Sequence, residues 1–351
     1  MDRPSFRVVG LMAGSSHDGL DIALVRFWSS QGYWRYALLS AETVPYPPSL
    51  KDALHQTLHL PGEALLKLSI LYTDWTAHIL RERLQGQVFD LISWHGPTVF
   101  HQPEAGLTWS LGDSERLRAL TGKPVVTHFR ARDIALGGQG APLIPHADAL
   151  LWPEYETLLN LGGIANITHC PTYTAFDITP CNQLLNALAQ QLHPPLPYDP
   201  HGTFARQGQL FPPLQETFAS APVFQSPTPT AITNEIVHTQ FIAPFLAYPA
   251  PAQDKLHTAV HAITTRISQT LRDLSCQKVY LTGGGAWNTY LVETIQRLSP
   301  CTCLLAPKEL VDFREAIGFA FLGLLRYLGQ DNLFGFWTQT RQNQCAGLLS
   351  L

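Results

Sequence analysis

Charged side chains are scarce in this sequence: they make up 14% of its 351 residues, whereas soluble proteins average about 25%. Apolar residues make up 45%, and this excludes a disordered chain, because disorder requires low hydrophobicity together with high charge. Acidic residues outnumber basic ones by 27 to 23, so the net charge is −4. A chain without a positive field does not attract a nucleic-acid backbone, and we expect no nucleic-acid partner.

A long apolar run is also missing. A membrane-spanning helix needs about 20 consecutive apolar residues, and the longest candidates, such as 317–325, have the length of a core helix. A strand-like run begins at Val8 and a turn follows at Gly14, too early for the apolar segment of a secretory signal. We therefore expect a cytoplasmic protein with no membrane partner.

Cysteine occurs without the spacing of a metal site. The six cysteines include no Cys-x-x-Cys pair, and Cys301 and Cys303 fit one face of a strand. A disulfide across that spacing would be strained, and zinc sites require paired clusters. Free thiols are expected.

The length favours two domains, because an average domain has about 100–200 residues. Alternating apolar and polar residues predict strands, and apolar residues at three- and four-residue spacing predict helices. In the first part, strands are expected at 7–12, 20–27, 33–44, 90–94, 108–111 and 124–127, and helices at 49–60, 63–87 and 113–121.

The second part repeats this order of elements. Strands are expected at 157–161, 164–168, 174–177 and 278–282, and helices at 183–192, 252–275, 288–298 and 313–328. Residues 194–229 hold many prolines and predict loop and short helices. A glycine turn between the first two strands of both parts indicates two similar α/β lobes with a cleft between them.

Three glycine-containing turns are candidate phosphate sites, at 14–16, 161–166 and 281–288. Glycine lets backbone N–H groups approach phosphate oxygens because no Cβ is in the way. The third turn follows a strand and precedes a helix, an arrangement that suits a nucleotide. Each turn alone is also compatible with an ordinary tight turn.

Asp177 is the candidate general base. It ends a short apolar strand, and a carboxylate at a strand tip is well placed to accept a proton in a cleft. A helix cap or a turn residue is the alternative interpretation.

Taken together, these segments resemble the anhydro-N-acetylmuramic acid kinases, which belong to the actin/hexokinase/Hsp70 superfamily. The opening GLMAGSSHDGLD is similar to the family's first phosphate motif, and DITPCN keeps the Asp, Pro and Asn of its catalytic motif. The remaining matches lie in order along nearly the whole chain, at 94–98, 129–133, 137–143, 160–166, 198–202, 283–288 and 315–320.

The resemblance implies a two-lobed actin-like ATPase fold, related to ribonuclease H, with a central cleft. It places 1–130 plus about 314–351 in an N-terminal lobe and 131–313 in a C-terminal lobe. The implied reaction uses ATP and Mg²⁺ to open a 1,6-anhydro sugar and phosphorylate O6. A small sugar is the expected partner, and a homodimer is compatible with the family.

The resemblance also assigns roles to residues. Asp177 would activate the attacking water, and Asp18 is the candidate metal ligand. His95, Arg130, Asn182 and Glu315 are the candidate sugar ligands. The implied ATP and phosphate ligands are Gly14, Ser15, Ser16, His17, Asp18, Gly19, Leu20, Asp21, Gly162, Gly163, Asn166, Gly283, Gly284, Gly285 and Asn288.

Several positions depart from the family motifs near the expected sugar side. Pro97 and Ser110 replace glutamines, His128 replaces an aspartate, and Thr179 replaces a glycine. Two alternatives therefore stay open: the same chemistry on another anhydro sugar resembling levoglucosan, and an ATP-binding sensor without catalysis. The retained Asp177 argues against the sensor.

Overall fold

The computed structural model describes residues 5–14, 19–225 and 232–351. The chain divides into two compact units, Met1–Pro153 with Glu315–Leu351, and Glu154–Arg314. Helices α4 and α5, Phe129–Ala135 and Pro145–Leu151, belong to the first unit. The lobe boundaries that the resemblance implies stay a prediction.

The first unit is built on a six-stranded sheet in the order β13-β7-β4-β1-β2-β3. β1 pairs antiparallel with β2 and parallel with β4, and β2 continues antiparallel to β3. The strands span Phe6–Ala13 (β1), Gly19–Ser30 (β2), Tyr33–Pro45 (β3), Leu91–His95 (β4), Val125–Thr127 (β7) and Leu348–Ser350 (β13).

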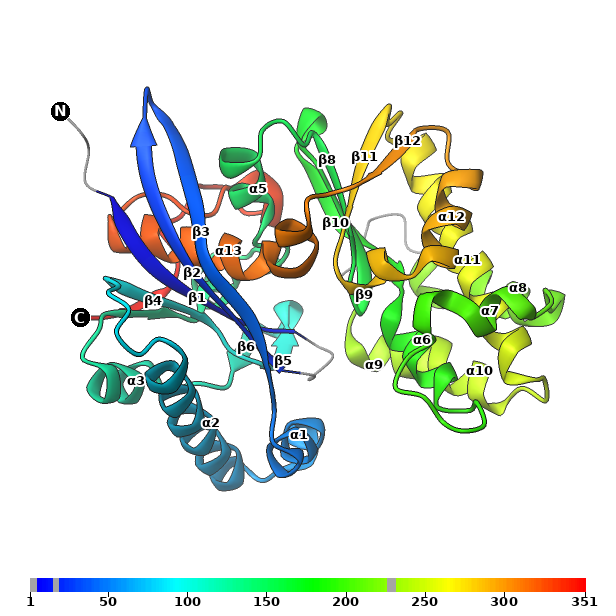
Figure 1. Cartoon of the computed structure of the whole chain (residues 1–351), viewed down its shortest axis with the longest axis horizontal. Helices are drawn as coiled ribbons and strands as arrows, with labels where there is room; N and C mark the ends of the chain where they lie inside the picture. Colours follow the sequence, from blue (N-terminus) through cyan, green and yellow to red (C-terminus); the bar gives the residue numbers. More distant parts are fainter. Residues whose placement is uncertain (1–4, 15–18, 226–231) are drawn as a thin grey trace. The chain divides into compact units, whose positions relative to one another are not determined.

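Helices cover both faces of this sheet (Figure 1). Helix α2, Gly62–Arg83, packs on one face, where Tyr72 stacks on Trp94 of β4 at 5.7 Å. Helix α13, Lys308–Tyr327, packs on the other, so close that a Cβ at Gly10 would lie 2.1 Å from the Ala316 carbonyl oxygen. β1 is therefore buried on both faces, which explains why most of its residues are apolar. The shorter helices are α1 (Pro48–His55), α3 (Ser114–Thr121) and α14 (Gly335–Thr338).

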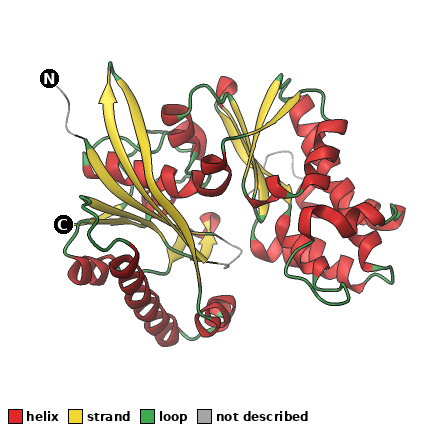
Figure 2. Cartoon of the chain, viewed as in Figure 1, coloured by secondary structure: helices red, strands yellow, loops and turns green. Residues whose placement is uncertain are grey.

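The second unit repeats the strand arrangement (Figure 2). Its sheet has the order β10-β9-β8-β11-β12, with β8, β9 and β10 antiparallel and β11 and β12 parallel to β8. This is the order β3-β2-β1-β4-β7 of the first sheet, with the same relative directions. The strands span Thr157–Leu161 (β8), Ile164–His169 (β9), Thr174–Pro180 (β10), Lys278–Thr282 (β11) and Thr302–Leu305 (β12).

Two helices of the second unit pack against strands of its sheet. α11 packs against β10 and α12 against β12. They span Asn182–Ala189 (α6), Thr203–Gln207 (α7), Pro212–Ala219 (α8), Asn234–Val237 (α9), Ala243–Ala247 (α10), Ala252–Asp273 (α11) and Thr289–Leu298 (α12).

The predicted α/β class and the repeated strand order are confirmed. The helix predicted over 49–60 ends at His55, followed by a short 3-10 turn, and the one predicted over 63–87 ends at Arg83. The hairpin of β5, Thr98–Gln102, and β6, Leu107–Ser110, was predicted only in its second strand. All six cysteines are free. Within the described ranges, no helix is both long and apolar enough to span a membrane.

Candidate functional site

Three polar residues form a row across the second sheet. Asn160 on β8 lies opposite Asn166 on β9, and Asn166 lies opposite Asp177 on β10. Residues directly opposite each other in antiparallel strands project from the same face. The row therefore places two amides and one carboxylate on one surface, in a sheet whose other central positions are mainly apolar.

Asp177 lies where the edge strand becomes irregular. The β9–β10 register shifts between Asp177 and Thr179, which indicates a bulge, and bulges commonly re-aim side chains next to functional sites. The carboxylate is half-buried, and its Oδ2 accepts a hydrogen bond of 3.0 Å from the Ile232 backbone N–H. A carboxylate in this position can accept a proton while its orientation is maintained.

The β8–β9 turn packs on the first turn of α6. The backbone N–H groups of Cys181 and Gln183 donate to the Gly163 carbonyl at 2.9 and 3.1 Å, and that of Asn182 donates to Gly162 at 3.1 Å. The turn carbonyls thus point toward the helix.

Asn182, an expected sugar ligand, contacts both glycine segments. Its Nδ2 donates to the Leu161 carbonyl at 2.9 Å, and a Cβ at Gly285 would lie 3.0 Å from its Oδ1. The Asn182 amide therefore holds the two segments together, and its role toward the sugar stays a prediction.

The Gly283–Gly285 segment passes directly beside β8. Gly283 has φ +79°, and a Cβ there would lie 2.4 Å from Asn160 Oδ1. A Cβ at Gly285 would lie 2.8 Å from the Leu161 carbonyl oxygen. The structure therefore brings Gly283, Gly285 and the polar row together. Asn160 begins a matching motif but was not predicted as a site residue, and its position opposite Asn166 was the signal that could have found it.

Asn288 and Trp287 follow this segment. The Asn288 Oδ1 accepts the Leu291 backbone N–H at 3.0 Å, so this side chain is the N-cap of α12. Trp287 is 40% exposed, and its Nε1 donates to Asp312 at 2.8 Å. Gly284 is exposed beside them.

The first glycine turn is described only at its ends. Ser15, Ser16, His17 and Asp18 lie outside the described residues. Gly14 and Gly19 flank them, and a Cβ at Gly19 would lie 2.6 Å from the Val44 carbonyl oxygen. Two further expected ligands follow on β2: Leu20 has its side chain in the core, so only its backbone is available to a ligand, and the Asp21 carboxylate accepts a 2.6 Å hydrogen bond from Thr43.

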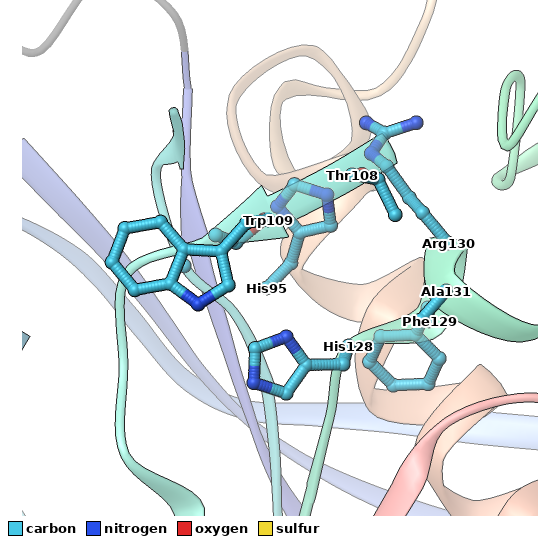
Figure 3. A pocket seen from close by; sticks show the side chains of 9 residues that line it. His95, Thr108, Trp109, His128, Phe129, Arg130 and Ala131 are labelled. Atoms are coloured by element: carbon cyan, nitrogen blue, oxygen red, sulfur yellow. The ribbon is translucent and has the colours of Figure 1, made fainter. Parts of the chain in front are cut away.

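A pocket lies in the first unit, beside the carboxyl end of β4. In Figure 3 the ring of His95 lies between Trp109 and Arg130, and His128 lies below it. His95 is opposite Met12 of β1, as Thr282 is opposite Asn160 in the second sheet. The pocket is lined by His95, Gly96, Thr108, Trp109, Ser110, His128, Phe129, Arg130 and Ala131.

His95 is a buried side chain at the wall of this pocket. It is 6% exposed, its ring lies 4.4 Å from that of Phe319, and neither ring nitrogen makes a hydrogen bond of good geometry to a described residue. Leaving a buried polar atom unpaired costs about 1–3 kcal/mol. Burial first, and then the positive charge of Arg130, hold the pKa of His95 well below its usual value, so the ring is neutral at pH 7.

Arg130 is oriented by the glycine-rich loop that follows α4. Its Nη1 donates to the Gly140 carbonyl at 2.5 Å, and the Gly140 N–H donates to Asp133 at 2.6 Å. Asp133 is fully buried and also accepts hydrogen bonds from Thr338 and Gln344. Thr338 and Gln344 of the C-terminal segment thus orient the loop through Asp133. The Gly140 carbonyl of that loop in turn orients the Arg130 guanidinium.

The predicted residues form two groups, one in each unit. His95 and Arg130 meet in the first unit, and Gly162, Asn166, Asp177, Asn182 and the Gly283–Gly285 segment meet in the second. Glu315 is half-buried in α13 and is not among the residues that line the pocket.

Comparison with known proteins gives a family match over most of the chain. The family model described as anhydro-N-acetylmuramic acid kinase matches residues 6–331. A protein of that name from Idiomarina loihiensis is 34% identical over 90% of this chain and 91% of its own length. One from Nitrosomonas europaea is 33% identical over the same shares. A solved ROK family glucokinase from Streptomyces griseus covers 91% of this chain and 99% of its own, at 12% identity and a TM-score of 0.44.

Proposed function

Because the chain belongs to the anhydro-N-acetylmuramic acid kinase family, we propose that it is an ATP-dependent kinase of anhydro-N-acetylmuramic acid. The products are N-acetylmuramic acid 6-phosphate and ADP, as cell-wall recycling requires. The observation that carries this proposal is the row that ends in Asp177, beside the glycine segments of the second unit.

The reaction couples hydrolytic opening of the anhydro ring to phosphoryl transfer. Water attacks the anomeric carbon C1, and the bond between C1 and the bridging O6 breaks. Asp177 takes a proton from the water. The released O6 attacks the γ-phosphorus of ATP, the bond to the β-phosphate oxygen breaks, and ADP leaves. Charge on the transferred phosphoryl group is stabilised by backbone N–H groups at glycine turns.

Mg²⁺ is compatible with the residues present. Among the residues that the structure describes, no three His, Cys, Asp or Glu side chains gather as a metal site. Mg²⁺ commonly uses one or two carboxylates with substrate phosphates and waters, and Asp18 stays the proposed carboxylate. When bound, it neutralises the phosphate charges. The homodimer and the cytoplasmic location likewise stay predictions.

Replacement of Asp177 tests the base. Asp177→Asn keeps the shape but cannot accept a proton, so turnover should fall about 10²–10⁴-fold while ATP still binds. ADP release from ATP·Mg²⁺ and the sugar measures turnover. Asp273→Asn, an exposed carboxylate of the same unit, is the matched control and should keep the wild-type rate.

Isotope labelling tests which bonds form and which break. In ¹⁸O water the label should enter the sugar at C1 and not the phosphate. Near-normal turnover of Asp177→Asn would show that another group is the base, and label in the phosphate would indicate simple ATP hydrolysis. ADP release with levoglucosan but not with the muramic acid derivative would favour the second sugar class, and ATP binding without turnover would favour the sensor.

A further inference from the structure

Asp133 is a fully buried carboxylate that the proposed reaction does not use. It lies on α4, three residues after Arg130, and its two oxygens accept hydrogen bonds from different segments. Oδ1 accepts from the Thr338 hydroxyl at 2.5 Å and from the Gln344 amide at 2.6 Å. Oδ2 accepts from the Gly140 backbone N–H at 2.6 Å. Hydrogen bonds to a carboxylate are about twice as strong as neutral ones, so this side chain joins the glycine-rich loop firmly to the C-terminal segment.

The glycine-rich loop lies against this carboxylate without room for a side chain. A Cβ at Gly138 would lie 2.3 Å from Asp133 Oδ2 and 2.3 Å from Thr340 Cγ2. The Gly138 N–H donates to the Asp133 carbonyl at 2.9 Å. The Gln139 N–H donates to the Thr338 carbonyl, also at 2.9 Å. The loop is therefore held on one side by α4 and on the other by the C-terminal segment.

The C-terminal segment is anchored by contacts that do not involve this loop. Asn332 is fully buried, and its amide makes two hydrogen bonds with the Ala346 backbone, at 2.9 and 2.6 Å. The Arg326 guanidinium donates to the Gly347 carbonyl at 2.8 Å. Both contacts lie within three residues of Gln344, so its amide is presented to the carboxylate by backbone that is itself fixed.

Gly140 connects this support to Arg130. Its N–H donates to Asp133, and its carbonyl accepts a hydrogen bond from Arg130 Nη1 at 2.5 Å. The guanidinium lies at the pocket beside β4 (Figure 3), where the resemblance places a sugar ligand. A misplacement of about 1 Å in an active site can cost about 10²-fold in rate. A shift of the Gly140 backbone would therefore displace a group that the reaction uses.

We propose that Asp133 is a positioning residue, which fixes the Arg130 guanidinium through Gly140. Thr338 and Gln344 orient the Asp133 carboxylate in turn. The inference rests on the proposed function, because Arg130 acts there on the sugar. Asp133 is fully buried and is not among the residues that line the pocket. Its contribution to the reaction is therefore made through Arg130.

A double-mutant cycle tests whether Asp133 acts through Arg130. Asp133→Asn keeps the shape but replaces one acceptor oxygen by an N–H donor, and kcat/KM for anhydro-N-acetylmuramic acid should fall about 10²-fold. In an Arg130→Ala background the same change should lower kcat/KM by less than about 2-fold, because the group that Asp133 positions is already absent. Rates are normalised to the folded fraction, which thermal unfolding measures.

Two C-terminal variants test the support without altering the carboxylate. Thr338→Val and Gln344→Met each remove one hydrogen-bond donor, and each should lower kcat/KM about 10-fold. Arg130→Ala should abolish these effects as well. Both variants keep the test decisive if Asp133→Asn does not fold.

Thr73→Val is the matched control. Thr73 is also fully buried in the first unit, but its hydroxyl donates to the Ser69 carbonyl at 2.7 Å and accepts from the Asp113 N–H at 3.0 Å. The control variant should therefore lower Tm, as Thr338→Val does, and keep the wild-type kcat/KM.

The outcomes separate this inference from the proposed function. If the wild-type protein releases ADP with the sugar but the losses at Asp133 and Arg130 multiply, Asp133 only stabilises the fold, and the kinase proposal stands. Unchanged kcat/KM in Arg130→Ala overturns the inference equally. If the wild-type protein binds the sugar but releases no ADP, the kinase proposal fails, and the same cycle in calorimetric Kd decides the inference. If it binds no sugar, both fail.

Discussion

His146 shows how one residue makes stability depend on pH. It is 2% exposed on α5, its ring lies 4.1 Å from that of Phe334, and burial lowers its pKa to about 4. The native state keeps this imidazole neutral, whereas the unfolded chain binds a proton near pH 6.5. Between these values the unfolded state holds more protons, so the free energy of unfolding falls as the pH is lowered.

Between the two pKa values, the free energy of unfolding should fall by about 1.4 kcal/mol for each pH unit of acidification and for each such imidazole. Urea denaturation followed from pH 7.5 to pH 5 measures it, and His146→Gln should reduce the slope by about that amount. His59→Gln, at an exposed position, is the matched control. An unchanged slope in His146→Gln would show that the buried ring does not contribute.

At the scale of elements, the turn after β11 depends on glycine at one position. Gly283 combines φ +79° and ψ 163°, and a Cβ there would lie 2.4 Å from Asn160 Oδ1. Gly86 has a similar φ of +76° but nothing within 4 Å of its Cβ position. Gly283→Ala should therefore cost about 3 kcal/mol, and Gly86→Ala only about 1 kcal/mol.

Thermal unfolding of the two alanine variants measures the difference. The excess at Gly283 measures the close approach of β8 together with the cost of ψ 163° at a positive φ, a region that residues with a Cβ rarely adopt. Nucleotide binding should weaken in Gly283→Ala and not in Gly86→Ala. Equal destabilisation of the two variants would mean that β8 shifts to accommodate the added Cβ.

At the scale of the molecule, ATP·Mg²⁺ should stabilise the fold by mass action. At 100 times Kd the gain is about 2.7 kcal/mol, which for units of this size raises Tm by about 5–10 °C. Differential scanning fluorimetry with millimolar ATP·Mg²⁺ measures this, and Mg²⁺ alone is the control. No shift would contradict the kinase and the sensor together, because both need the nucleotide.

Local sequence signals predicted most of the fold. Short apolar runs located the central strands, which are buried on both faces, and apolar residues at three- and four-residue spacing located the long helices, which are buried on one face. Besides β5, the short strands Thr302–Leu305 and Leu348–Ser350 were missed. Their pairing depends on the open edges of β11 and β7, and three or four residues are too few to show a period.

The sequence by itself determined the α/β class, the glycine turns and the position of Asp177 at the end of a strand, because these follow from local patterns and motif spacing. Only the tertiary structure decided which atoms meet. It placed Asn160 and Asn166 in one row with Asp177, and it gathered a pocket from segments around residues 95, 109 and 130. Strand register and packing set such contacts between distant residues, and no local pattern encodes them.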